Sequence, residues 1–166
     1  MITSIVILAL VTAQRLGELV LARSNTARLM AQGGVETGAA HYPLIVALHA
    51  AWLAGLFLLA WDRPVNWYWM GLFVVLQLGR VWVIASLGAR WTTRIITVPG
   101  ETLVRRGPYR FVTHPNYVVV AAEIAVLPLA FGLSAFAAAF TVLNAAVLAI
   151  RIRAEAGALR GRAGVS

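Results

Sequence analysis

Residues 2–22, ITSIVILALVTAQRLGELVLA, decide what kind of fold this chain adopts. The run matches the ~20 apolar residues that a helix rising ~1.5 Å per residue needs to cross ~30 Å of hydrocarbon. No basic segment precedes it, and no cleavage site of small residues closes a short apolar core, so it does not have the pattern of a cleaved signal peptide. The sequence therefore predicts a membrane helix that the mature protein keeps.

The composition of the whole chain also indicates a membrane protein. Of its 166 residues 61% are hydrophobic and 12% are charged, whereas soluble domains have about 45–50% apolar and about 25% charged residues. This excludes disordered and collagen-like chains. The net charge of +8 comes from 14 Arg and no Lys; on a membrane chain we interpret it as a topology signal, and we expect no nucleic-acid partner. The absence of Cys excludes disulfides and thiolate ligands.

Further apolar segments follow the first helix. Two of them are joined by a short turn at 62–66, which makes them antiparallel neighbours, and two more form a hairpin that turns at Gly132. Pro128 is expected to kink or end the first arm of that hairpin. The predicted spans are 43–61, 67–87, 117–131 and 134–150. The sequence thus predicts an all-α, polytopic integral membrane protein with about five transmembrane helices and a C-terminal helical hairpin. We expect the last few residues of the basic tail to be disordered.

The arginines predict how the chain is oriented. With five crossings, residues 23–42, 88–116 and 151–166 lie on one side, and they hold eleven of the 14 Arg. The opposite side holds only Arg63. Because cytoplasmic loops are rich in Arg and Lys, we expect a bacterial-type inner (plasma) membrane protein whose arginine-rich side faces the cytoplasm and whose N-terminus lies outside.

Several polar residues interrupt the apolar segments. Arg15 and Glu18 are spaced i, i+3, which places them on one face of the first helix where they can pair. A charge at mid-membrane costs at least ~2.5–3.5 kcal/mol, so such residues face the bundle or a watery cavity. Arg15 and Glu18 therefore form a structural ion pair, or Arg15 extends to the nearby cytoplasmic interface. The alternative is that the two residues belong to a functional site.

The other polar residues in the spans divide into two groups. His49, Gln77 and Asn144 are uncharged, and such residues more often make packing hydrogen bonds than bind ligands. Arg80 and Glu123 carry charge in the cytoplasmic half of their helices and are stronger candidates. The residues we assign to a substrate-facing set are Arg15, Glu18, His49, Arg80 and Glu123. The three His show no metal-ligand spacing, so no metal site is expected.

The segment Arg105–Tyr117, RRGPYRFVTHPNY, is the richest in chemistry. Gly107-Pro108 predicts a turn, and Pro115 suits the first turn of a helix, whose positive N-terminal end attracts carboxylates and phosphates. Contact with anionic lipid head groups explains Arg105 and its neighbour well. It does not explain aromatic and proline residues at set positions.

This segment resembles a known signature. Gly107-Pro108-Tyr109-Arg110 followed by His114-Pro115-Asn116-Tyr117 is similar to the GPYxxxRHPxY element of the isoprenylcysteine carboxyl methyltransferase family. The tail RIRAEAGAL, residues 151–159, resembles the family's RxxxEExxL element. Two positions depart from the pattern: Thr113 stands for an Arg, and Ala156 for the second Glu.

The N-terminal part resembles a narrower group, a small bacterial branch found beside type III polyketide synthases, of which some members O-methylate alkylpyrones. The residues that carry this likeness are Arg15, Glu18, Asn25, Gly34, Glu36, His41, Tyr42 and His49.

The resemblance implies a single membrane-embedded methyltransferase domain over 1–166 that uses S-adenosylmethionine. Its cofactor-binding part would be about 87–160, and 1–86 would face a lipophilic acceptor that enters from the bilayer. The implied cofactor-binding residues are Trp91, Gly107, Tyr109, Arg110, His114, Pro115, Tyr117 and Glu155. The implied catalytic residues are Arg151, which would orient an anionic acceptor, and Glu155. Membrane lipids are the other expected partners.

Three alternatives stay open at this stage. The acceptor oxygen is either a carboxylate, which needs no base, or a hydroxyl, for which Glu155 or His114 would serve as base. A reductase that binds NADPH is a second reading, since sterol reductases carry a related element. A non-catalytic assembly protein, in which the arginines only set orientation, is the third.

Overall fold

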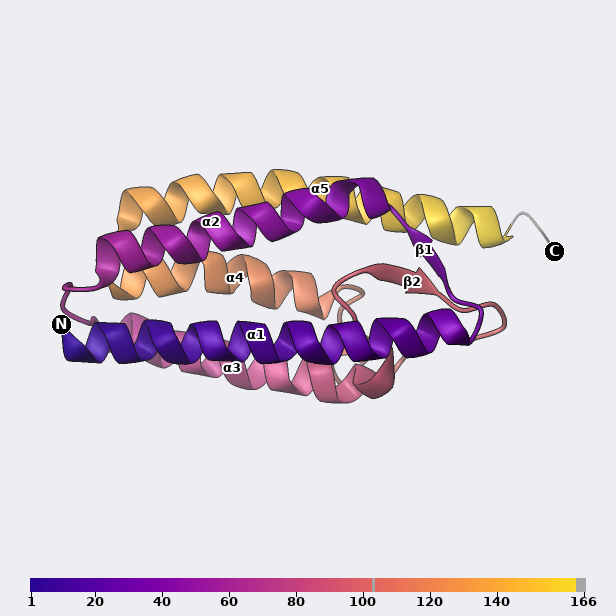
Figure 1. Cartoon of the computed structure of the whole chain (residues 1–166), viewed down its shortest axis with the longest axis horizontal. Coiled ribbons are helices and arrows are strands. Elements are labelled where there is room, and N and C mark those ends of the chain that lie inside the picture. Colours follow the sequence, from indigo (N-terminus) through magenta and orange to yellow (C-terminus); the bar gives the residue numbers. More distant parts are fainter. Residues whose placement is uncertain (103, 164–166) are drawn as a thin grey trace.

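The computed structural model shows a bundle of five helices in which the fourth lies at the centre (Figure 1). It describes the backbone of residues 1–102 and 104–163 and the side chains of 1–102 and 104–154. The helices are α1 (Ile2–Ala31), α2 (Tyr42–Ala60), α3 (Trp67–Leu87), α4 (Pro115–Ala130) and α5 (Ser134–Ala163). Four of them, all except α4, are long and apolar enough to cross a membrane. The predicted all-α, polytopic membrane fold is confirmed.

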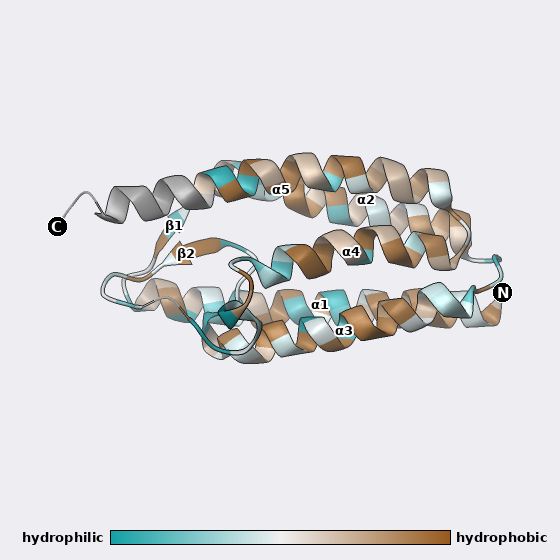
Figure 2. Cartoon of the chain, turned by 180° about the vertical axis from the view of Figure 1, so that it is seen from behind, coloured by the Kyte–Doolittle hydropathy of each residue, from teal (hydrophilic) through white to brown (hydrophobic). Residues whose placement is uncertain are grey.

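Apolar side chains occupy both the inside and the outside of this bundle. The core joins Leu8 of α1, Leu56 of α2 and Phe73 of α3 to Ile124 and Leu127 of α4, all of them nearly inaccessible. Many large apolar side chains, such as Leu10, Leu58 and Val142, are also exposed on the outside, and hydrophobic residues extend along all five helices (Figure 2). A lipid environment on the outside accounts for this, because exposed apolar groups have no cost there.

One end of the bundle is closed by short turns. The Asn66 side chain caps α3 by accepting a hydrogen bond from the Tyr68 N–H at 3.1 Å. The backbone N–H of Asn66 donates to the Ala130 carbonyl at 2.8 Å. The Ser4 hydroxyl donates to the Arg63 carbonyl at 2.6 Å. As expected, α4 ends shortly after Pro128, at Ala130.

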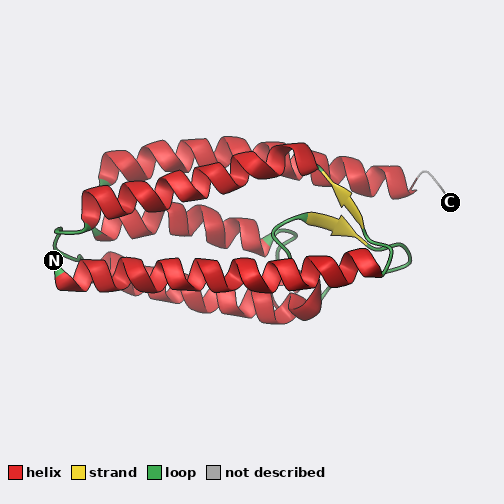
Figure 3. Cartoon of the chain, viewed as in Figure 1, coloured by secondary structure: helices red, strands yellow, loops and turns green. Residues whose placement is uncertain are grey.

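The other end carries the long connections. A small antiparallel sheet pairs β1 (Val35–Thr37) with β2 (Ile95–Thr97), placing Val35 opposite Thr97 (Figure 3). Three short 3-10 helices, η1 (Ala39–His41), η2 (Gly88–Arg90) and η3 (Gly107–Arg110), complete these loops. The sequence did not predict the sheet. It ties the first arginine-rich loop to the second, and the described part of the third segment, residues 151–163, lies at the same end of the bundle (Figure 1).

Two helices are longer than the sequence indicated. The first was expected over 2–22 but continues to Ala31, because its polar last turns dock on the loop after α3. Asn25 donates to the Trp91 carbonyl at 2.8 Å and Arg28 to the Ala89 carbonyl at 2.6 Å. The last helix continues through the basic tail to Ala163. The predicted disorder of the final positions falls on 164–166, outside the described residues.

Candidate functional site

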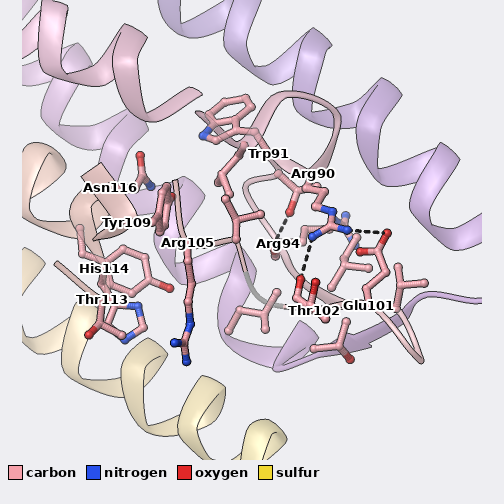
Figure 4. Close-up of a pocket in the computed structure, with 18 of the residues that line it drawn as sticks. Arg90, Trp91, Arg94, Glu101, Thr102, Arg105, Tyr109, Thr113, His114 and Asn116 are labelled. Carbon is pink, nitrogen blue, oxygen red and sulfur yellow. Dashed lines mark hydrogen bonds and ion pairs between the residues drawn. The ribbon is translucent and has the colours of Figure 1, made fainter. Parts of the chain in front are cut away.

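Two cavities lie at the end of the bundle that carries the sheet. The first, of about 500 Å³, is enclosed mainly by the loop between α3 and α4 (Figure 4). The second, of about 290 Å³, lies deeper among α1, α2 and α5. The residues that line both cavities are Trp91, Thr92, Asn116, Tyr117 and Arg151. The two cavities therefore share a wall.

The turn at Gly107 holds the loop that encloses the first cavity close to α3. Gly107 has φ +57°, and a Cβ on it would collide with the Ser86 side chain of α3. The Arg106 Nε donates to the Ser86 carbonyl at 2.7 Å, and Pro108 is buried. Gly107 thus lets the loop approach α3 closely and does not itself line the cavity.

Substituting Gly107→Ala is expected to lower both stability and ligand binding. Gly100 is a matched control, because it also has a left-handed φ of +79° but would place its Cβ in open space. Left-handed backbone costs an L-residue about 1–2 kcal/mol, so only the clash distinguishes the two variants. Thermal unfolding in detergent should show Gly107→Ala less stable than Gly100→Ala by about 1–3 kcal/mol. Equal stability would show that the close approach to α3 is unimportant.

The two halves of the signature meet at Arg151. Its Nε donates to the Tyr117 hydroxyl at 2.8 Å, and its Nη1 donates to the Thr93 carbonyl at 2.9 Å. The Tyr117 ring in turn stacks on His114, with ring centroids 5.0 Å apart and planes at 12°. A single buried guanidinium therefore joins α5, α4 and the loop at the wall between the cavities.

Two buried polar atoms at this wall have no partner among the described residues. They are the Trp91 Nε1 and the Asn116 Oδ1. The Trp91 side chain is 2% exposed, and an unsatisfied buried group of this kind costs about 1–3 kcal/mol. Both residues line the two cavities, and Figure 4 shows them on the first. A donor and an acceptor are thus available to a ligand.

The rim of the first cavity is positively charged. Arg90 pairs with Glu101 at 3.2 Å, and Arg94 pairs with Glu36 across the sheet at 2.9 Å. The hydrogen bond to Glu36 raises the pKa of Arg94, whose guanidinium lies 4.6 Å from the centre of the Tyr42 ring. Among the lining residues, arginines outnumber carboxylates, which favours an anionic group on the ligand.

The second cavity is mostly apolar and reaches the lipid-facing surface. Leu16 and Leu19 of α1 and Ile45 and Val46 of α2 contribute to its walls. Leu16 is 58% exposed and Val46 is 44% exposed on the outside of the bundle. These two residues therefore line the cavity and also belong to the apolar outer surface of the bundle.

The polar side of the second cavity is a network of four charges, Arg15, Glu18, Arg80 and Glu123, called the charge network below. Arg80 donates twice to Glu18, both at 2.6 Å, and once to Glu123 at 3.0 Å. Arg15 donates to Glu18 at 3.1 Å and to Glu123 at 2.9 Å. The predicted pairing of Arg15 with Glu18 is confirmed, and its partners on α3 and α4 place Arg15 inside the bundle rather than at the interface.

The charge network is electrically balanced and further hydrogen-bonded. Gln14 donates to Gln77 at 2.7 Å, and Gln77 donates to Glu123 at 2.8 Å. Two guanidinium groups face two carboxylates, so the network carries no net charge. Such pairing offsets the cost of burying charge in hydrocarbon. It joins α1, α3 and α4 beside the second cavity.

The structure distributes the predicted site residues over both cavities. Those lining the first are Trp91, Tyr109, Arg110, His114, Tyr117 and Arg151. Those lining the second include Arg15, Glu18, His49, Arg80 and Arg151. Glu123 is bound behind them, and Pro115 is buried at the first turn of α4. The side chain of Glu155 lies outside the described residues.

Sequence reasoning missed several residues of this region. Asn116 stands inside the signature, between Pro115 and Tyr117, but at the position that the pattern leaves variable. Gln14, one turn before Glu18, had a visible i, i+4 spacing to it. The hydrogen bond between Tyr42 and Thr93, 3.0 Å long, joins residues 51 apart in the chain, and no local signal predicts it.

The fold and the site define a polytopic membrane protein with a polar loop cavity that adjoins an apolar, lipid-accessible one. The model of the isoprenylcysteine carboxyl methyltransferase family matches residues 69–161, and the chain belongs to this family. It is 39% identical over 160 residues to the uncharacterised protein YpbQ of Bacillus subtilis, covering 93% of this chain and 95% of that protein. No solved structure matches it significantly. Family membership indicates a membrane methyltransferase.

Proposed function

We propose that this protein is an S-adenosylmethionine-dependent O-methyltransferase of lipophilic small molecules. The acceptor would be isoprenylcysteine-like or alkylpyrone-like, and its carboxylate or hydroxyl oxygen would receive the methyl group. One observation carries this proposal: a polar cavity and an apolar, lipid-accessible cavity share the wall formed by Trp91, Thr92, Asn116, Tyr117 and Arg151. A donor in one and an acceptor in the other would meet there.

The first cavity fits the cofactor that the family implies. Its volume of about 500 Å³ is in the range of small-molecule sites. The unpaired Trp91 Nε1 and Asn116 Oδ1 offer one donor and one acceptor to a nucleoside. His114 and Tyr109 lie beside the N-terminal end of α4, which favours a carboxylate. We propose that Glu155 binds the ammonium group or a ribose hydroxyl of the cofactor.

S-adenosylmethionine, when bound, supplies an electrophilic methyl group on a sulfonium. The protein's own contribution is to align the acceptor oxygen and to exclude water, which together account for much of the acceleration in such displacements. Trp91 would exclude water from the reacting atoms, because its ring is buried at the shared wall. Arg151, fixed by Tyr117 and Thr93, is placed to orient an anionic oxygen there.

The acceptor would occupy the second cavity with its tail toward the lipid. Its polar head would face Arg151 and the charge network, and its apolar body would lie between Leu16 of α1 and Val46 of α2. We further propose that this end of the bundle faces the cytoplasm, where the cofactor is made. The eleven arginines on that side of the predicted topology support this orientation.

Ligand binding in detergent tests the proposed cofactor. S-adenosylhomocysteine at a hundredfold excess over its Kd should stabilise the protein by ~2.7 kcal/mol in thermal unfolding, and NADPH should not. Trp91→Phe keeps the ring but removes the unpaired N–H, so S-adenosylhomocysteine should bind about 2–10-fold more weakly, the equivalent of about 0.5–1.5 kcal/mol. Trp67→Phe is the control, because Trp67 is 68% exposed at the opposite end of α3 and lines neither cavity. Stabilisation by NADPH alone would instead favour a reductase.

A further inference from the structure

His49 of α2 has its protonation pattern set by the backbone. Its Nδ1 lies 2.8 Å from the Ile45 carbonyl oxygen, one turn earlier in the helix. A carbonyl only accepts hydrogen bonds, so Nδ1 carries the proton, and in the neutral ring Nε2 carries a lone pair. The ring lines the second cavity, and no described residue makes a hydrogen bond to Nε2. The cavity therefore contains a basic nitrogen held in one tautomer.

The other candidate base on this cavity is already occupied. Both oxygens of Glu18 accept hydrogen bonds from arginines: Oε1 from Arg80, and Oε2 from Arg80 and Arg15. Bonds from cations stabilise the carboxylate and weaken it as a base. The hydroxyls of the cavity's two tyrosines are already engaged: Tyr42 shares a hydrogen bond with the Thr93 hydroxyl at 3.0 Å, and Tyr117 accepts one from Arg151 at 2.8 Å. His114 lines the first cavity and not the second.

The charges that face the ring are also defined. Arg15, Glu18 and Arg80 belong to the charge network, whose net charge is zero, and Arg151 stands at the shared wall. A cavity with this lining has no need of a base for a carboxylate acceptor, which is already ionised at neutral pH. A hydroxyl acceptor must lose a proton as its oxygen is methylated.

We infer that His49 is the general base of the reaction and that the acceptor is a lipophilic hydroxyl compound, a phenol or an enol. This inference rests on the proposed function. The acceptor oxygen forms a bond to the methyl carbon and displaces the sulfur, which keeps the electron pair of the broken C–S bond. The hydroxyl proton passes to His49 Nε2. The ring then releases this proton to water before the next turnover.

Methyl-labelled cofactor tests the inference with the full-length protein in membranes. Lipids extracted from cells that lack the gene serve as the acceptor source. We expect the labelled product to be a methyl ether that survives mild alkali. His49→Gln, which accepts a hydrogen bond but takes no proton, should lower kcat at least about 100-fold and leave KM and S-adenosylhomocysteine binding unchanged. His41→Gln, outside both cavities, is the control.

The pH profile separates a base from a packing residue. With His49→Gln the rate should rise about tenfold per pH unit toward the pKa of the acceptor, whereas the rate of the unaltered protein should level off once the ring is neutral. His49→Asn retains a donor for the Ile45 carbonyl and should behave like His49→Gln. An alkali-labile methyl ester, or a variant with full activity and an unchanged profile, would overturn the inference and leave the methyltransferase in place. No labelled product from the unaltered protein would overturn the proposed function itself.

Discussion

Replacing Glu123 with Ala is expected to destabilise the protein by about 3–5 kcal/mol, because one partner of a buried ionic network is removed. Glu123 is 2% exposed and accepts hydrogen bonds from Arg15, Arg80 and Gln77. Without it two guanidinium groups share the single carboxylate of Glu18 inside the bundle. Thermal or denaturant unfolding in detergent micelles measures the loss.

A solvent-exposed ion pair provides the matched control for this prediction. Glu101→Ala removes the partner of Arg90, and because the two side chains are 35% and 36% exposed, the loss should be about 1 kcal/mol or less. Exchanging Arg15 and Glu18 keeps the local pair and the total charge, but it brings a carboxylate to Glu123 and a guanidinium to Arg80. We expect that double variant to be as unstable as Glu123→Ala. Near-native stability in both would show that the network adds little to the fold.

Replacing Arg151 with Ala is expected to lower methyl transfer about 10³-fold, the upper range for loss of one preorganised donor. Arg151 is 9% exposed and contacts both the Tyr117 hydroxyl and the Thr93 carbonyl at the shared wall. Binding of S-adenosylhomocysteine should weaken less than tenfold. Initial rates with labelled cofactor, together with the thermal shift, measure the two effects separately.

Two further variants define what Arg151 contributes. Arg151→Lys keeps the charge but has a single ammonium in place of the planar fork that reaches two oxygens, so it should also be impaired. Arg153→Ala, on the same helix but exposed, is the control for a general effect of positive charge. Full activity of Arg151→Ala would contradict its role in orienting the acceptor.

Much of the fold was predictable because a membrane helix can be identified from the length of its run of apolar residues. The span 67–87 agrees with the observed Trp67–Leu87, and the hairpin turn at Gly132 was placed correctly. The extension of α1 to Ala31 was not predicted, since polar helix beyond the membrane has no hydropathy signal. The three-residue strands were missed because they depend on pairing between Val35 and Thr97, far apart in the sequence.

The sequence predicted many residues of the candidate site, but few of the contacts that those residues make between helices. The i, i+3 spacing of Arg15 and Glu18 indicates their pairing, because it depends on one helix alone. Their contacts with Arg80 and Glu123 depend on how three helices pack, which spacing does not specify. The division into two cavities was likewise not predictable. It arises where the loop after α3 places Trp91 against the start of α4.

The short length of α4 affects how far a lipophilic substrate would have to leave the bilayer in order to react. Its 16 residues extend ~24 Å, and its end at Ala130 is tied to Asn66 at the far side of the bundle. If Ala130 lies at the far boundary of a ~30 Å hydrocarbon layer, the beginning of α4, with Asn116 and Tyr117, lies several ångströms below the near boundary. Pulling a twelve-carbon chain into water would cost roughly 10 kcal/mol at ~0.8 kcal/mol per methylene. A reaction centre at the proposed shared wall would then lie below the membrane surface, and the substrate would not have to leave the hydrocarbon.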